Sequence, residues 1–342
     1  MIRTKTTLIV GAGASCELQL PSGPELLDRM AQGFDFNRFG GAQLTRDNTA
    51  FLKYLAKMAE RPGTTNELLY TATTRLRISA KLGTSIDGII EQNDDDQLVT
   101  LCGKLAIAHF ITQGEAKSSL RLTPKTEGEL PLQIGDYWLV ELGRMITSGV
   151  PRSKVEQCFD NLVIVSFNYD RSVEHFLPFA LVTAYGMPLK EARRIVAAKL
   201  NIVHPYGTIG RLPWQTGEGP DIEWGTENPW NMLNLISQIR THGELLRDSR
   251  AFQAVRGAVS KCQRIVFLGF GFHPQNLDLL LDGSMSHNPD VVASFYQMSQ
   301  PLQTAVVRML HRKLNLDRED RLLTIDAKCY DVLRDYGMML ES

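Results

Sequence analysis

Short apolar stretches alternate with amphipathic helical patterns along much of the chain. The apolar stretches lie at residues 7–10, 162–166, 202–203 and 264–268, with a further candidate at 291–295. Such short, nearly continuous runs are typical of strands that are buried on both faces of a parallel sheet. Apolar residues at helical spacing recur at 189–200, 229–246, 303–314 and 328–336. The alternation predicts an α/β fold, a Rossmann-like doubly wound parallel sheet.

The stretch from residue 31 to residue 158 has no convincing strand pattern. Helical spacing covers 48–60, 64–80, 94–112 and 136–147, and a looser loop is expected at 113–135. Ser85 could cap a further short helix. We therefore expect a single domain over 1–342. Its Rossmann-like core comprises 1–30 and 159–342, and 31–158 forms a helical insertion module.

Composition and charge favour a soluble globular protein over a membrane or nucleic-acid-binding one. The 342 residues are 43% hydrophobic and 22% charged, as in a soluble globular protein. A net charge of −1 gives no reason to expect direct nucleic-acid binding or attachment to an anionic membrane. We find no apolar run of about 18 residues and no signal peptide, so we expect no membrane span and a cytoplasmic location. The 5 cysteines lack a C-x-x-C pair, which predicts reduced thiols and no metal.

The first strand runs directly into the sequence Gly-Ala-Gly-Ala-Ser, residues 11–15. Gly11 and Gly13 let the backbone turn tightly and bring N–H groups against a phosphate at the start of a helix. The third glycine of the dinucleotide fingerprint is replaced by Cys16. The segment therefore indicates a nucleotide pyrophosphate but argues against an ordinary dehydrogenase. A plain tight turn is the alternative.

The second strand ends in Ser-Phe-Asn-Tyr-Asp, residues 166–170, at the edge where ligands bind in open α/β sheets. The amide of Asn168 both donates and accepts hydrogen bonds, which suits ribose hydroxyls, a carboxamide or a water molecule. Asp170 could accept a hydrogen bond from a ribose or an amide. Alternatively, the two residues only cap the helix that follows.

The last two strand ends also carry polar or glycine residues. His204 closes the third strand, and a histidine there could act as a general base towards water or a hydroxyl. After the fourth strand, Gly269 and Gly271 let backbone approach a ligand, and Asn276 lies in the first turn of a helix. A structural histidine and a capped glycine turn are the alternatives.

Taken together, the four strand ends resemble the sirtuin-like superfamily, and specifically its bacterial NAD-hydrolysing branch associated with anti-phage defence. Sirtuins pair a Gly-Ala-Gly-x-Ser turn with a Thr-Gln-Asn-x-Asp strand end and a His-Gly base. The defence proteins carry the Asn-Tyr-Asp form that is present here at 168–170. The matching motifs lie within 1–30 and 160–340, and over the helical module the likeness is only architectural.

The resemblance implies a role for each matching residue. Asn168 would position the nicotinamide ribose or the attacking water with the support of Asp170, and His204 would be the base. The remaining positions would bind the rest of NAD: Gly11, Ala12, Gly13 and Ser15 the pyrophosphate and its neighbouring ribose, and Gly269, Gly271 and Asn276 the adenosine half. Two departures stand out, since the zinc-binding cysteine quartet is absent and His204 is followed by Pro-Tyr-Gly.

The implied activity is that of an NAD+ hydrolase that cleaves the nicotinamide N-glycosidic bond and releases nicotinamide and ADP-ribose. NAD is then the substrate, and the chain is an NAD-depleting effector of anti-phage defence. Two other functions stay open. An NAD-dependent protein deacylase would release nicotinamide only with an acylated peptide, and a non-catalytic sensor would bind NAD or ADP-ribose without turnover.

Destruction of NAD has to be controlled, so the resemblance also implies assembly as a homo-oligomer or with a partner such as a HerA-type ATPase or an Argonaute. The helical module could supply the contact surface through Leu68, Leu69, Leu76 and Ile78. Alternatively, these residues belong to the lid and core of the domain.

Overall fold

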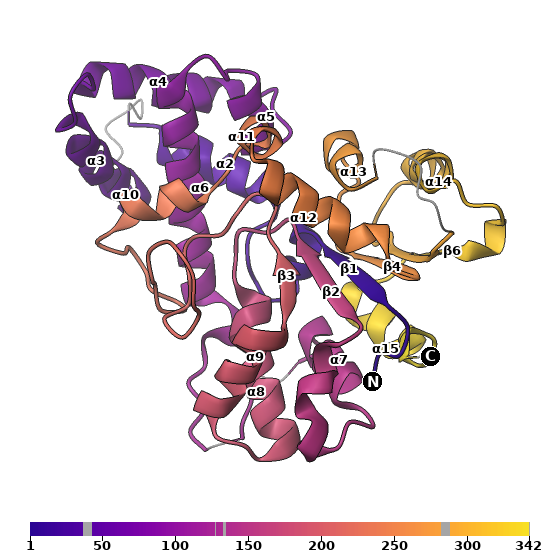
Figure 1. Cartoon of the computed structure of the whole chain (residues 1–342). Coiled ribbons are helices and arrows are strands. Elements are labelled where there is room, and N and C mark those ends of the chain that lie inside the picture. Colours follow the sequence, from indigo (N-terminus) through magenta and orange to yellow (C-terminus); the bar gives the residue numbers. More distant parts are fainter. Residues whose placement is uncertain (37–42, 127, 133–134, 282–287, 342) are drawn as a thin grey trace.

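The computed structural model describes residues 1–36, 43–126, 128–132, 135–281 and 288–341 (Figure 1). Its centre is one sheet of 6 parallel strands in the order β3-β2-β1-β4-β5-β6. The strands are β1 (Thr6–Val10), β2 (Leu162–Ser166), β3 (Asn201–Val203), β4 (Arg264–Leu268), β5 (Asp290–Ser294) and β6 (Leu322–Ile325). This is the strand order of the Rossmann fold, so the predicted doubly wound α/β class is confirmed.

Helices connect the strands and form the layers around the sheet. The α-helices are α1 (Ala12–Cys16), α2 (Gly23–Gly33), α3 (Arg46–Ala59), α4 (Asn66–Ser79), α5 (Ile86–Glu91), α6 (Gln97–Lys117), α7 (Trp138–Thr147), α8 (Ser172–Tyr185), α9 (Leu189–Lys199), α10 (Met232–Leu235), α11 (His242–Arg247), α12 (Ser249–Ser260), α13 (Pro274–Leu281), α14 (Gln300–Leu314) and α15 (Cys329–Glu341). Short 3-10 segments are η1 (Ser119–Arg121), η2 (Arg152–Phe159), η3 (Ile236–Gln238) and η4 (Glu319–Arg321).

The sheet separates two hydrophobic cores because successive side chains of a strand point to opposite faces. Ile9 of β1 belongs to the core that contains α12, α13 and α14. Leu8 and Val10 belong to the core on the other face, with α7, α8, α9 and α15. All five residues of β1 are buried, as expected for a central strand covered on both faces.

The predicted helical region divides between two places in the fold. Helices α2 to α6 pack against one another and are grouped at the upper left of Figure 1, where α10 packs on α6. Helix α7 instead packs against α8 and α15 beside the sheet. Within the group, Leu69 and Leu76 are completely buried, whereas Leu68 and Ile78 are 46% and 55% exposed. Two of the four residues proposed for assembly are therefore core residues.

Three details of the predicted element pattern were wrong. The stretch 229–246 is not one helix, because Thr241 begins a new one: its side chain and that of Glu244 form a capping box at the start of α11. The loop expected from residue 113 begins later, since α6 continues to Lys117. The sequence pattern also missed β6, which pairs with β5, because its residues are only half-buried or exposed.

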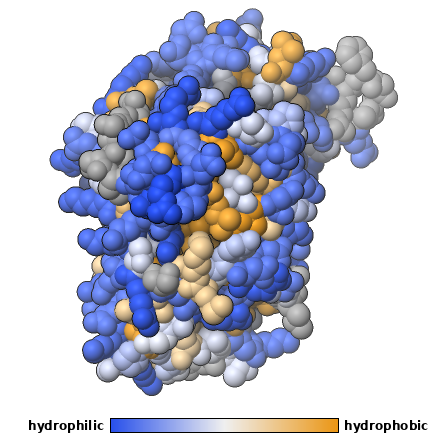
Figure 2. Space-filling view, turned by 90° about the vertical axis from the view of Figure 1, so that its right-hand side faces the viewer, coloured by the Kyte–Doolittle hydropathy of each residue, from blue (hydrophilic) through white to orange (hydrophobic). Residues whose placement is uncertain are grey.

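Figure 2 shows the face of the molecule that lies to the right in Figure 1, where α13 and α14 are labelled; it is mostly hydrophilic, with a hydrophobic area near its middle. Across the described ranges, no helix is long and apolar enough to cross a membrane.

Candidate functional site

The carboxyl ends of β1 and β4 meet in a joint made of three glycines. A Cβ atom at Gly11 would lie 2.5 Å from the carbonyl oxygen of Gly269, and one at Gly13 would lie 2.8 Å from its Cα. Gly269 has a φ of +57°, and a Cβ there would lie 2.1 Å from the nitrogen of Ala14. Each contact is with backbone, so only glycine fits at these positions. The strand order reverses at this joint, which makes it the switch point of the sheet.

The N–H groups of two of these glycines are used within the joint. The N–H of Gly11 donates to the carbonyl of Leu268 at 3.0 Å, and that of Gly13 donates to the carbonyl of Gly269 at 2.9 Å. Helix α1 is also short, with only five residues. In this structure the glycines therefore hold two strand ends together rather than present free N–H groups to a phosphate.

Three of the predicted site residues form one buried hydrogen-bonded cluster over this joint. The amide nitrogen of Asn168 donates to the carbonyl of Gly11 at 2.9 Å and to Oγ of Ser15 at 2.7 Å. The Ser15 hydroxyl donates in turn to Oδ2 of Asp170 at 2.7 Å. Both hydrogens of the Asn168 amide are thus engaged. Its oxygen, Oδ1, meets no donor among the described residues and is the group that could accept from a ligand.

His204 lies directly behind Asn168. Its Nδ1 is 3.1 Å from the main-chain carbonyl of Asn168, and its Nε2 is 3.0 Å from Oε1 of Glu174. Both partners are acceptors, so both ring nitrogens donate when the ring is protonated. Burial alone would lower the pKa of His204, but Glu174 and the Asn168 carbonyl outweigh it and raise that pKa. Burial alone would raise the pKa of Glu174, but the charge and hydrogen bond of His204 lower it.

These shifts predict a pH-dependent contribution to stability. The raised pKa of His204 gives a contribution that is complete below the ordinary value of 6.5 and is lost as the pH rises through the folded value. The loss is about 1.4 kcal/mol for every pH unit between the two values. We expect the free energy of unfolding of the wild type to fall towards that of His204→Gln as the pH rises from about 6.5. Urea unfolding of both proteins across this range measures it. A constant difference between them would contradict the ion pair.

A second polar cluster lies at the same edge of the sheet. The Tyr169 hydroxyl donates to Oδ1 of Asp87 on α5, which connects the strand end to the helical region. The Tyr206 hydroxyl donates to Oδ1 of Asn276 at 2.6 Å. Burial raises the pKa of Asp87 despite its bond with Tyr169. Asn276, predicted to border the adenosine half, therefore contacts Tyr206 rather than the cluster around Asn168.

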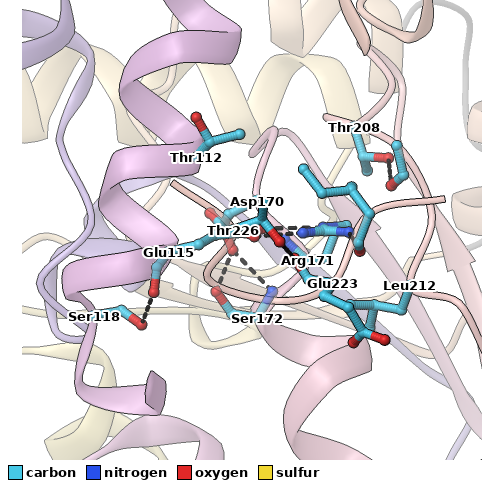
Figure 3. A network of polar contacts seen from close by, with 12 residues as sticks. Thr112, Glu115, Ser118, Asp170, Arg171, Ser172, Thr208, Leu212, Glu223 and Thr226 are labelled. Atoms are coloured by element: carbon cyan, nitrogen blue, oxygen red, sulfur yellow. Dashed lines mark hydrogen bonds and ion pairs between the residues drawn. The ribbon is translucent and has the colours of Figure 1, made fainter. Parts of the chain in front are cut away.

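A buried ion pair fixes the turn that carries Asp170 (Figure 3). Arg171 and Glu115 of α6 each have only 1% of the side chain exposed, and Nε of Arg171 donates to Glu115 at 3.1 Å. Nη1 of Arg171 also donates to the carbonyl of Ile222 at 2.7 Å. On the other side, Ser172 donates both its N–H and its hydroxyl to Oδ1 of Asp170. The turn is thus held by two other parts of the chain, α6 and the segment at Ile222, and by its own residue Ser172.

The structure brings together Gly11, Ser15, Asn168, Asp170 and His204, and it joins Gly13 to Gly269. Gly271 is exposed, and Ala12 has no side-chain polar group to contribute. Sequence reasoning missed the roles of Glu115, Arg171 and Glu174 as buried partners. One signal was available, because Glu115 falls at a buried position in the apolar pattern of α6, beyond the point where the helix was expected to end.

Within the described part of the chain, no group of three or more His, Cys, Asp or Glu side chains is arranged to hold a metal ion.

Comparison with known proteins gives a distant likeness only. No family model matches the chain, and no curated protein matches it. Among solved structures, it is similar to a triple mutant of a Sir2 homologue in complex with 2'-O-acetyl ADP ribose. The two share 10% identity over 99% of this chain and 93% of the other, with a TM-score of 0.42. A likeness this distant assigns neither a site nor an activity to this chain.

Proposed function

We propose that the chain is an NAD+ hydrolase that cleaves the bond between nicotinamide and ribose. The observation that supports this most directly is the cluster of Asn168, Ser15 and Asp170 over the switch point of the sheet. Nucleotides bind in Rossmann-ordered sheets at this point. The sirtuin-like pattern of the strand ends adds the substrate, NAD, and the bond to be broken.

For this reaction the protein has mainly to orient the substrate and the attacking water and to stabilise positive charge on the ribose. Nicotinamide leaves a cationic pyridinium as a neutral molecule, so no acid is needed to protonate it. The ribose carbon becomes electron-poor in a transition state similar to an oxocarbenium ion. Oδ1 of Asn168 is suited to accept a hydrogen bond from the attacking water or a ribose hydroxyl. The buried Asp170 accepts the hydrogen bond of Ser15 beside it, and such fixed polar groups act most strongly where water is excluded.

The part that His204 takes in this proposal follows from its partners. The sequence pattern suggested a base, but a base needs a nitrogen free to accept a proton. Here one nitrogen faces the Asn168 carbonyl and the other faces Glu174. We therefore propose that His204 holds the main chain of Asn168 in place, and that it could act as a base only after releasing one of these partners.

The remaining proposals concern the residues that bind the rest of NAD and the role of the protein in the cell. Gly11, Ala12, Gly13 and Ser15 are proposed to border the pyrophosphate, and Gly269, Gly271 and Asn276 the adenosine half. Because the N–H groups of Gly11 and Gly13 are engaged and the side-chain positions of both face the backbone of Gly269, their proposed contribution is to hold the joint against which the pyrophosphate lies. We further propose a cytoplasmic, NAD-depleting effector of anti-phage defence that is controlled by self-assembly or by a partner such as a HerA-type ATPase.

Substitution of Asn168 tests the proposal. We expect Asn168→Ala to lower the rate of nicotinamide release from NAD by about 10²–10³-fold, the usual effect of losing one oriented polar group in an active site. Asn168→Asp keeps an acceptor oxygen but loses the two donated hydrogen bonds. Its rate of nicotinamide release should therefore lie between those of the wild type and Asn168→Ala. Nicotinamide is measured by chromatography under the same assembly conditions for each protein.

Asn234→Ala is the matched control, because Asn234 is exposed and distant in sequence from the cluster. Binding of NAD by calorimetry, measured in parallel, separates a loss of chemistry from a loss of substrate. Equal turnover by wild type and Asn168→Ala would overturn the proposed role. Tight binding without turnover in either protein would instead favour a sensor.

A further inference from the structure

One buried atom near the site has no partner in the hydrogen-bonded clusters around Asn168. Glu174 is only 4% exposed, and its Oε1 is bound to His204. Its second oxygen, Oε2, meets no hydrogen-bond donor among the described residues. The pKa of this side chain is lowered, so the carboxylate carries charge at neutral pH. A buried charged oxygen without a donor is unfavourable, and such atoms commonly mark the place of a ligand or of bound water.

Glu174 lines a cavity of about 140 Å³ between α8, α9 and the loop after β3. We call it the Glu174 cavity; Ala197, Trp214 and Thr216 also line it. The same three residues line a larger hollow of about 810 Å³ at the surface, which we call the α9 groove. The three shared residues place the cavity and the groove side by side.

The α9 groove presents mainly positive charge, from Lys190, Arg193 and Arg194 against Glu191. Of these charged residues, Arg193 says most about a ligand. It is half-buried, and its Nε is a second buried polar atom without a partner among the described residues. Glu174 thus brings an unpartnered anionic oxygen to the cavity, and Arg193, which lines the groove, carries an unpartnered N–H donor. The two observations are independent, since they concern different atoms on different helices.

We propose that the Glu174 cavity and the α9 groove form one binding site for a small amino acid that carries its amine and its acid at opposite ends. The ammonium group donates to Oε2 of Glu174, and the carboxylate accepts from Arg193 in the groove. The apolar walls contributed by residues such as Ala197 and Trp214 accommodate the carbon chain. None of the residues that line this site belongs to the proposed NAD site, and a ligand would enter it from the α9 groove. Its Glu174 carboxylate is also bound to His204, which in turn contacts the main-chain carbonyl of Asn168.

The test uses ω-amino acids of increasing length, β-alanine, γ-aminobutyrate and 5-aminovalerate, with the intact chain and without NAD. We expect one length to raise the thermal unfolding midpoint in a saturable way, because a ligand that binds only the folded state stabilises it. Butylamine and butyrate, which each carry one of the two charges, should raise it less at the same concentration. Calorimetry then gives the dissociation constant.

Variants locate the binding. Arg193→Gln removes the outer charge and should weaken binding at least about tenfold, as expected for a hydrogen bond between charged groups. Ala197→Phe fills the junction of the cavity and the groove and should abolish binding; Ala197 is exposed, so this protein is expected to fold. Arg250→Gln changes an exposed arginine of α12 outside the site and should bind as the wild type does.

Three results would overturn the proposal: no ω-amino acid shifts the midpoint, butylamine alone binds as tightly, or Ala197→Phe binds as the wild type does. If no ω-amino acid shifts the midpoint, water is the only partner left for Oε2 of Glu174. Because NAD is absent throughout, failure here is distinguishable from failure of the proposed hydrolase activity.

Discussion

Glu115→Ala is expected to destabilise the protein by about 3–5 kcal/mol, the typical effect of removing one partner of a buried ion pair. The reason is that Arg171, with 1% of its side chain exposed, would keep its charge in a buried site without a carboxylate. The loss should appear as a lower midpoint in urea unfolding. It should also loosen the turn that carries Asp170, since α6 would no longer hold it.

Two further proteins make this prediction specific. The double variant Glu115→Gln/Arg171→Met should recover much of the loss, because no charge then remains buried without a partner. Asp320→Ala removes an ion pair with Arg318 in which the side chains are 65% and 62% exposed, and it should leave the midpoint unchanged. If Glu115→Ala unfolds at the wild-type midpoint, the pair does not support the turn.

Gly269→Ala is expected to cost about 2–4 kcal/mol, because two separate penalties coincide at this position. The new Cβ would lie 2.1 Å from the backbone nitrogen of Ala14, and the φ of +57° strains any residue with a side chain. The close contact cannot be relieved by a rotamer change, since the neighbouring atom belongs to the backbone. Calorimetric or urea unfolding gives the size of the loss.

Two glycines serve as matched controls for this change. Gly149 also has a positive φ, of +69°, but nothing would lie within 4 Å of a Cβ at that position, so Gly149→Ala measures the backbone strain alone at about 1 kcal/mol. At Gly271 a Cβ would meet only the side chain of His273, at 3.2 Å, and Gly271→Ala should change stability by less than about 0.5 kcal/mol. Equal effects at Gly269 and Gly149 would show that the joint tolerates a side chain.

The sequence predicted the sheet well because buried parallel strands are encoded locally, as short apolar runs. It failed at β6, whose residues, Leu322 to Ile325, are half-buried or exposed and lack that signal. It also failed around residue 241, where a capping box rather than the apolar pattern decides where a helix begins. Helix boundaries depend on such single hydrogen bonds, and a spacing pattern averages over them.

In the candidate site too, the sequence predicted which residues lie together but not which partners they contact. Strand ends indicated Asn168, Asp170 and His204 because parallel strands bring their carboxyl ends to one edge. What the side chains do there depends on partners distant in sequence. The Asn168 amide meets Gly11, and His204 meets Glu174, and neither contact has a sequence signature. The glycines follow the same rule, since their local pattern indicates a phosphate cradle, whereas their distant contacts make them a joint between β1 and β4.

The most direct test of the central claim is a product analysis with NAD as the sole substrate. The chain, alone and after assembly with its neighbouring gene products, is incubated with NAD, and nicotinamide and ADP-ribose are quantified. We predict equal amounts of the two products from the wild type, without any acylated peptide, and release about 10²–10³-fold slower from Asn168→Ala. NAD that stays intact under every assembly condition, or nicotinamide that appears only with an acylated peptide, would contradict this claim.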